Sequence, residues 1–108
     1  MKIFAAREQD AHEGWVWIYK PELPQRCTIK ITNLANNKSV YCEALQIDEN
    51  FLKHYNQDPR YFINDRENSI VIGEWYRAGL GGISTNSIME LSIQPCNSYL
   101  VQYQASIH

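Results

Sequence analysis

The sequence lacks an excess of charge of either sign: ten Lys and Arg residues face twelve Asp and Glu residues, for a net charge of -2. Proteins that bind nucleic acid neutralise phosphates with clustered basic side chains, and the basic residues here are scattered. No run of like charge is present to attract an anionic membrane surface or an acidic tail. We therefore expect neither a nucleic-acid partner nor a membrane partner.

Long apolar runs and paired cysteines are also missing. No stretch is long enough to cross a membrane, and the N-terminus has only four apolar residues before a charge, too few for a signal peptide. Cys27, Cys42 and Cys96 are odd in number, widely spaced and form no CxxC unit, which excludes a fully paired disulfide framework and a zinc or redox motif of that type. We expect a reduced, soluble, cytoplasmic protein with no metal and no other cofactor.

What is present is an ordinary globular composition, with 44% hydrophobic and 20% charged residues in a chain of 108. This length predicts one domain with its own core. Residues 1–14 are mixed in character and form an N-terminal lead-in whose packing the sequence leaves open. Residues 15–108 form the single predicted domain.

The stretch from Ser69 to Pro95 organises the prediction. Ser69–Ile72 is apolar and β-branched, as in a buried strand, and Gly73 is a permissive N-cap for a short helix over Glu74–Leu80. Two glycines then end the helix, and Ile88–Gln94 returns as a strand.

Further strands and one more helix are predicted upstream. Trp15–Tyr19 is apolar at every position, and Cys27–Thr32 and Ser39–Leu45 alternate in polarity on either side of an asparagine-rich turn, which is typical of a hairpin. Asp48 is a candidate N-cap for a helix over Glu49–Tyr55.

Tyr61–Ile63 and Tyr99–Tyr103 are possible additional short strands. Short strands at intervals of about 10–15 residues, with helices of only one or two turns between them, favour a small barrel. We expect a mainly β fold: a six-stranded β-barrel with two short helices.

Two segments resemble the double-psi β-barrel superfamily. Residues 23–40, LPQRCTIKITNLANNKSV, resemble a strand and turn of rare-lipoprotein-A and expansin-like barrels. Ser69–Pro95 resembles the strand–helix–strand unit shared by those barrels and by the N-domains of valosin-type AAA ATPases. The resemblance implies a double-psi topology. Lytic members place an aspartate before the short helix, where this chain has Val71, and the segment around Asp48 also departs from their pattern, which argues against cell-wall hydrolysis.

Polar groups give no convincing catalytic or metal site. Glu43, Asp48, Glu49 and Glu74 show no pairing of the kind that a glycosidase requires. The three histidines, His12, His54 and His108, share no metal-ligand spacing, and no sequence signature supports a nucleophilic pair of Cys42 or Cys96 with His54. We predict no catalytic residues and no metal ligands.

Aromatic residues, 12% of the chain, supply the candidate binding residues. Trp17 and Tyr19 lie on one face of a predicted strand, although core packing is the simpler interpretation for Trp17. Trp75, Tyr76 and Arg77 open the second helix, and adjacent helix positions cannot all face inward, so at least one of the three should face solvent. Amphipathic aromatics and arginine are favoured at interfaces.

We therefore predict a non-catalytic module that binds a protein partner or a second copy of itself through an aromatic and basic patch, as the resemblance to ATPase N-domains implies. The alternative is a barwin- or expansin-like barrel that acts on or binds polysaccharide. Two convergent acids in a groove would favour the alternative. An accessory protein with an unknown partner is a third possibility.

Overall fold

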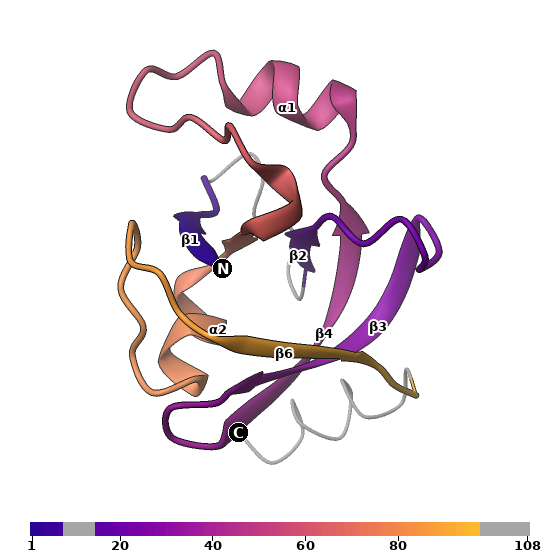
Figure 1. Ribbon diagram of the computed structural model, residues 1–108, viewed down its shortest axis with the longest axis vertical. Coiled ribbons are helices and arrows are strands. Elements are labelled where there is room, and N and C mark those ends of the chain that lie inside the picture. The colour runs from indigo at the N-terminus through magenta and orange to yellow at the C-terminus, as the bar shows by residue number, and fades with distance from the viewer. Residues whose placement is uncertain (8–14, 98–108) are drawn as a thin grey trace.

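The computed structural model describes residues 1–7 and 15–97, which form a six-stranded sheet curled into a half-barrel and two short α-helices (Figure 1). The predicted mainly β fold with six strands and two short helices is confirmed. Along the sheet the strands run in the order β1-β5-β2-β4-β3-β6. The elements are β1 Lys2–Ala5, β2 Trp15–Ile18, β3 Arg26–Asn33, β4 Lys38–Gln46, α1 Glu49–Tyr55, the 3-10 turn η1 Arg66–Asn68, β5 Ser69–Ile72, α2 Glu74–Gly79 and β6 Leu91–Pro95.

Strand β5 is buried along its whole length. It has the predicted bounds, and it pairs in parallel with β1 and antiparallel with β2. Ile70 and Ile72 contribute to a hydrophobic cluster inside the curl of the sheet, and Val71 contributes to a second cluster beneath α1. A strand with apolar neighbours on both faces requires apolar residues at every position, which explains why it does not alternate in polarity.

The β3–β4 hairpin forms as its alternating pattern predicts. Ile29 pairs with Cys42 and Ile31 with Val40, and all four side chains are buried on the same face. The turn contains Asn37 with φ of 61°, a left-handed conformation that asparagine tolerates better than most residues.

The first residues of the chain pack on the domain as strand β1, a point that the sequence left open. Ile3 is fully buried, and its backbone N–H donates to the carbonyl of Ser87 at 2.9 Å while its own carbonyl accepts from the N–H of Asn86 at 2.7 Å. The N-terminal amino group of Met1 donates to the carbonyl of Met89 at 2.6 Å. The segment before β6 therefore covers the outer edge of β1, and β6 then crosses to pair with β3 (Figure 1).

Two hydrophobic clusters lie on opposite faces of the sheet. We call them the barrel cluster, inside the curl, and the helix cluster, between the sheet and α1. The barrel cluster comprises Ile3, Val16, Ile18, Ile29, Ile31, Val40, Cys42, Ala44, Ile70, Ile72, Tyr76, Leu80 and Ile83. The helix cluster comprises Phe4, Ile47, Phe51, Tyr55, Ile63 and Val71.

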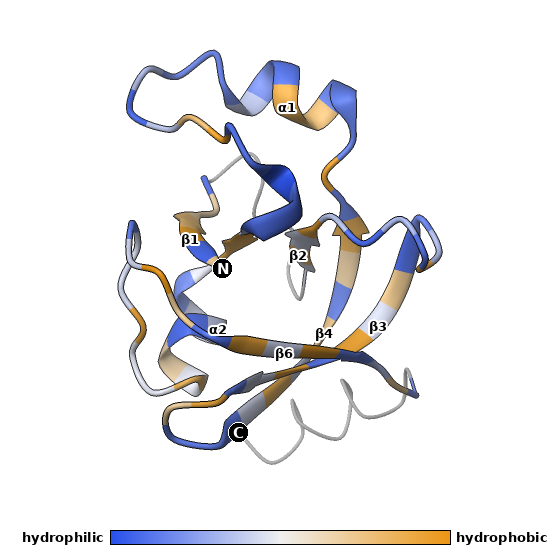
Figure 2. Ribbon diagram, viewed as in Figure 1, coloured by the Kyte–Doolittle hydropathy of each residue, from blue (hydrophilic) through white to orange (hydrophobic). Residues whose placement is uncertain are grey.

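Helix α1 has the predicted bounds and the predicted cap. The Asp48 carboxylate accepts a hydrogen bond from the N–H of Phe51 at 2.8 Å, which satisfies a donor that the first turn leaves without an intrahelical partner. The helix carries both hydrophilic and hydrophobic residues (Figure 2), and Phe51 and Tyr55 are its buried residues.

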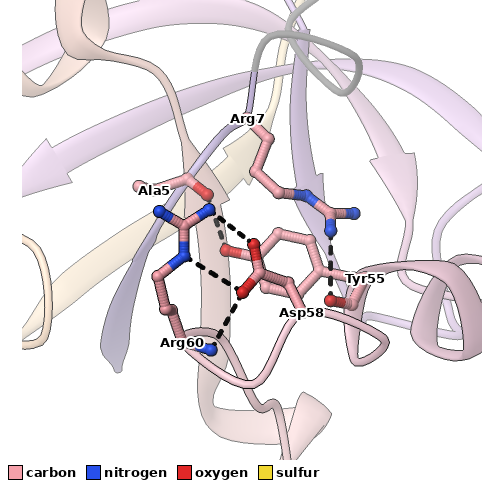
Figure 3. Close-up of polar contacts among 5 residues, drawn as sticks. All are labelled: Ala5, Arg7, Tyr55, Asp58 and Arg60. Atoms are coloured by element: carbon pink, nitrogen blue, oxygen red, sulfur yellow. Dashed lines mark hydrogen bonds and ion pairs between the residues drawn. The ribbon is translucent and has the colours of Figure 1, made fainter.

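Tyr55 and Arg7 join α1 to the end of β1 (Figure 3). The Tyr55 hydroxyl donates to the carbonyl of Ala5 at 2.6 Å. The Arg7 guanidinium lies 4.4 Å from the centre of the Tyr55 ring and donates to the Tyr55 carbonyl at 3.2 Å. These contacts attach the chain after β1 to the helix cluster.

Two predicted strand segments differ in the structure. Tyr61–Ile63 forms no strand, because the backbone of Ile63 bonds with the side chain of Asn56 instead of a neighbouring strand, at 2.9 Å through its N–H and 3.1 Å through its carbonyl. The strand predicted over Ile88–Gln94 corresponds to β6, which begins only at Leu91. Ile88 lies outside it and makes an isolated β-bridge to Lys2. The possible strand over Tyr99–Tyr103 lies outside the described residues.

Replacing the α1 cap should destabilise the fold measurably. We expect Asp48→Ala to lower the free energy of unfolding by about 1 kcal/mol, since an N–H of the first turn loses its acceptor. Urea denaturation measures the change, with Asp48→Asn as the control because asparagine also caps helices well. Equal stability of Asp48→Ala and the wild type would show that the cap contributes nothing.

Asp58 should make stability depend on pH in strongly acidic solution. Hydrogen bonds from the Arg60 side chain, at 2.8 and 3.1 Å, and from its backbone N–H, at 3.0 Å, lower the pKa of Asp58 to about 2 (Figure 3). Because the folded pKa lies below the ordinary value, the stabilisation is complete above about pH 4 and is lost as the pH falls through about 2.

Carbon-detected NMR titration of the Asp58 carboxyl measures this pKa directly. We expect a midpoint near 2 in the wild type and a return toward the ordinary value in Arg60→Gln, which removes the side-chain donors. A midpoint at the ordinary value in the wild type would contradict the bonded geometry.

Candidate functional site

Helix α2 presents adjacent side chains to different surroundings. Its N-cap is Gly73, directly after β5, and successive side chains point about 100° apart around its axis. Trp75 is 51% exposed, whereas Tyr76 is 7% exposed and belongs to the barrel cluster. The prediction that at least one residue of the Trp75–Arg77 segment faces solvent is confirmed.

Tyr76 lies in the core and positions its neighbour. Burial raises the pKa of Tyr76 to about 12, with smaller contributions from Cys42 and Glu43. The Trp75 ring meets the Tyr76 ring edge-on, with centroids 4.8 Å apart and an interplanar angle of 86°. Such edge-to-face pairs are favourable, and here the contact holds the exposed indole against a buried support.

Arg77 lines a surface hollow of about 390 Å³ beside α2. Glu74, Arg77 and Ala78 share one face of the helix, and the loop after it completes the wall with Gly82, Ile83, Ser84 and Thr85. The Arg77 guanidinium forms no ion pair with any described residue, and its buried Nε has no hydrogen-bond partner. Most buried polar groups in proteins are paired, so this nitrogen is an exception within the fold.

Trp17 and Tyr19 lie on the other face of the sheet and do not join this surface. The Trp17 ring stacks on Phe51 with centroids 4.2 Å apart, and both Trp17 and Tyr19 pack against the helix cluster. Their neighbours in β2, Val16 and Ile18, point into the barrel cluster, because successive strand residues face opposite sides. For Trp17 the core-packing interpretation therefore fits the structure.

A second hollow, of about 310 Å³, lies next to Tyr19 and includes Pro21 and Leu23. The Arg66 guanidinium lies 4.1 Å from the centre of the Tyr19 ring. It also forms an ion pair with Glu49 at 3.1 Å and donates to a backbone carbonyl. Unlike Arg77, this arginine is already satisfied within the fold.

The C-terminus of α2 is fixed by contacts that the sequence did not reveal. The carbonyl of Leu80 accepts hydrogen bonds from the side-chain amides of Asn33 at 2.9 Å and Asn36 at 3.0 Å. Gly81 follows with φ of 99°, and a Cβ there would meet the Asn36 side chain. The asparagine-rich turn was the only available signal, and its composition predicted a turn rather than a helix cap.

Three of the four carboxylates considered from the sequence, Glu43, Asp48 and Glu49, are engaged within the described part of the chain. Glu43 accepts from the Thr28 hydroxyl at 2.6 Å. Asp48 and Glu49 both line the hollow beside Tyr19, but the first caps α1 and the second pairs with Arg66. Each of these two carboxylates therefore already has a structural role within the fold.

The pKa values of the three thiols are raised, and Cys42 is the buried one among them. Cys42 is fully buried in the barrel cluster, and burial raises its pKa well above the ordinary value. Burial likewise raises the pKa of Cys27 and Cys96. His54 is exposed on α1, where its Nδ1 lies 2.8 Å from the carbonyl of Asn50. A thiolate–imidazole pair with Cys42 therefore does not form in this structure.

Within residues 1–7 and 15–97, no group of three or more acidic, histidine or cysteine side chains is placed to hold a metal ion. The helices in this part of the chain are all too short or too polar to span a membrane.

Comparison with known proteins adds no family to this picture. No protein-family model matches the chain, and no curated protein matches it significantly.

The different environments of Trp75 and Tyr76 predict different responses to truncation. We expect Tyr76→Ala to lower the free energy of unfolding by about 3 kcal/mol or more, because it empties a core position. Trp75→Ala should lower it by no more than about 1 kcal/mol, since half of the side chain is already in solvent. Denaturant unfolding of both variants measures the difference. Comparable losses would place Trp75 in the core and remove it from the candidate site.

Proposed function

We propose that this protein is a non-catalytic binding module that recognises a protein partner through the surface formed by Trp75, Arg77 and the adjoining hollow. We call this the α2 surface. One observation carries the proposal: α2 presents an exposed tryptophan and, two residues further on, an arginine that lines a hollow and whose buried Nε has no hydrogen-bond partner among the described residues. Tryptophan and arginine are the residue types most enriched in the energetically dominant positions of interfaces.

The α2 surface is also preorganised. Tyr76 supports the Trp75 ring from the core, and two asparagine amides hold the carbonyl at the end of the helix. A surface that is already ordered loses less conformational entropy when it binds, so more of the contact energy contributes to affinity.

The other aromatic and basic pair is less suited to this role. Tyr19 and Arg66 border a hollow of similar size, but Arg66 would have to give up its ion pair with Glu49 and its bond to the carbonyl of Ile47. Arg77 forms no ion pair with a described residue, and its Nε has no hydrogen-bond partner among them. This difference favours the α2 surface.

Two further expectations belong to the same proposal. The curled six-stranded sheet with two short helices supports kinship with the double-psi β-barrel superfamily, among whose members the ATPase N-domains bind other proteins. The free thiols of Cys27, Cys42 and Cys96 support a reducing, cytoplasmic environment.

Selection of phage-displayed random peptides on the wild-type protein tests the proposal. We expect the enriched peptides to lose binding to Trp75→Ala while they retain it on Phe62→Ala. Phe62 is a matched control because it is a 63% exposed aromatic in the segment between α1 and β5. Failure to enrich any peptide, or equal binding to Trp75→Ala and the wild type, would contradict the proposal.

Light scattering on the same proteins distinguishes the partner. A wild-type dimer that Trp75→Ala converts to a folded monomer would show that the partner is a second copy. A monomeric wild type that binds the selected peptides would assign the α2 surface to a different protein.

A further inference from the structure

We infer that the hollow beside α2 receives a carboxylate of the partner, bound by the Arg77 guanidinium. This inference rests on the proposed function, because it assumes that the α2 surface is the binding surface, and it adds the chemistry that the surface recognises. A carboxylate is the natural match for the guanidinium fork, which can donate two parallel hydrogen bonds to its two oxygens.

The unpaired state of Arg77 is the first observation behind the inference. Its buried Nε has no hydrogen-bond partner among the described residues, and leaving a buried donor unsatisfied is unfavourable. The fold therefore gains nothing from a bond to this guanidinium in its present orientation. Turning it toward a ligand would break no hydrogen bond, and the ligand would supply the missing acceptor.

The loop opposite α2 supplies additional donors. Ser84 and Thr85 line the same hollow as Arg77, and their side-chain hydroxyls donate to no described residue. The carbonyl of Ser84 accepts a hydrogen bond from the Ser87 hydroxyl, which leaves the Ser84 hydroxyl itself uninvolved. Two hydroxyls and a guanidinium around one hollow make a set of donors that suits an acceptor-only group.

Glu74 decides which anion fits. It lines the hollow on the same helix face as Arg77 and forms no ion pair there with a described residue. Its negative charge offsets the positive charge of Arg77, so the hollow has no excess positive charge with which to neutralise a phosphate dianion. One arginine opposed by one glutamate therefore favours a singly charged ligand.

Trp75 adds the apolar half of the recognition. It is in contact with Tyr76 and is three residues from Ala78, which lines the hollow. A peptide that places a carboxylate on Arg77 can lay an adjoining apolar side chain on the exposed indole. The expected ligand is thus a protein segment with an acidic side chain or a free C-terminus next to an apolar residue.

Calorimetric titration with the Trp75-dependent peptides from the selection tests this chemistry. Each peptide is synthesised unchanged, with each acidic residue replaced by its amide, and with an amidated C-terminus, so that the two sources of the carboxylate are separated. We expect one of these replacements to weaken binding to the wild type by about tenfold to a hundredfold, the range for a hydrogen bond to a charged group.

Variants of the protein show whether Arg77 is the receiving group. Arg77→Gln should weaken binding of the unchanged peptide by a similar factor, and the amide replacement should then have no further effect. Arg77→Lys should bind more tightly than Arg77→Gln and more weakly than the wild type, because lysine keeps the positive charge but lacks the two parallel N–H donors of the guanidinium. Glu74→Gln should tighten binding by a few-fold, since it removes the opposing charge.

The outcomes separate this inference from the proposed function. The inference would be overturned, and the proposed function would stand, if the Trp75-dependent peptides kept their affinity in two tests. These are the replacement of the peptide's carboxylates and the Arg77→Gln substitution in the protein. Displacement of the peptide by inorganic phosphate more strongly than by acetate would overturn the choice of a carboxylate. If selection yields no Trp75-dependent peptide, both are overturned.

Discussion

Burial of β5 on both faces is the constraint on which the rest of the structure depends. Ile70 and Ile72 occupy the barrel cluster while Val71 occupies the helix cluster, so both faces of this short strand must be covered by other elements. Helix α1 covers one face, and α2 and β6 enclose the other as the sheet curls. Since only the N-cap Gly73 separates β5 from α2, the position of the strand also determines which side chain of the helix enters the core.

The α2 surface follows from that placement. A helix of six residues is not stable alone in water, so tertiary contacts must hold it. Tyr76 and Leu80 bind it to the barrel cluster, and Asn33 and Asn36 bond to its last carbonyl. Because Tyr76 and Leu80 face the core, the helix directs Trp75 toward solvent and Arg77 into a hollow. The recognition chemistry that we propose is a consequence of how the core is closed.

Much of the fold could be predicted from local sequence because the signals are local. Both helices begin at their predicted caps, and β5, with its unbroken apolar composition, has the predicted bounds. The packing of β1 was not predictable, since its partner strand lies more than 60 residues away and its flanking residues are mixed in character. The prediction of a strand over Tyr61–Ile63 was wrong, because the side chain of Asn56 forms hydrogen bonds with the backbone N–H and carbonyl of Ile63. Composition identified the aromatic and basic residues of the site, but the split between a buried Tyr76 and an exposed Trp75 required the orientation of α2 against the sheet.

A chemical-shift map with a bound peptide tests the central claim most directly. The measurement compares the backbone and indole resonances of isotope-labelled wild-type protein with and without a peptide that depends on Trp75. The account predicts that the largest changes fall on residues 74–85, which span α2 and the loop that completes the hollow. Changes centred on the hollow beside Tyr19, or spread evenly over the sheet, would contradict it.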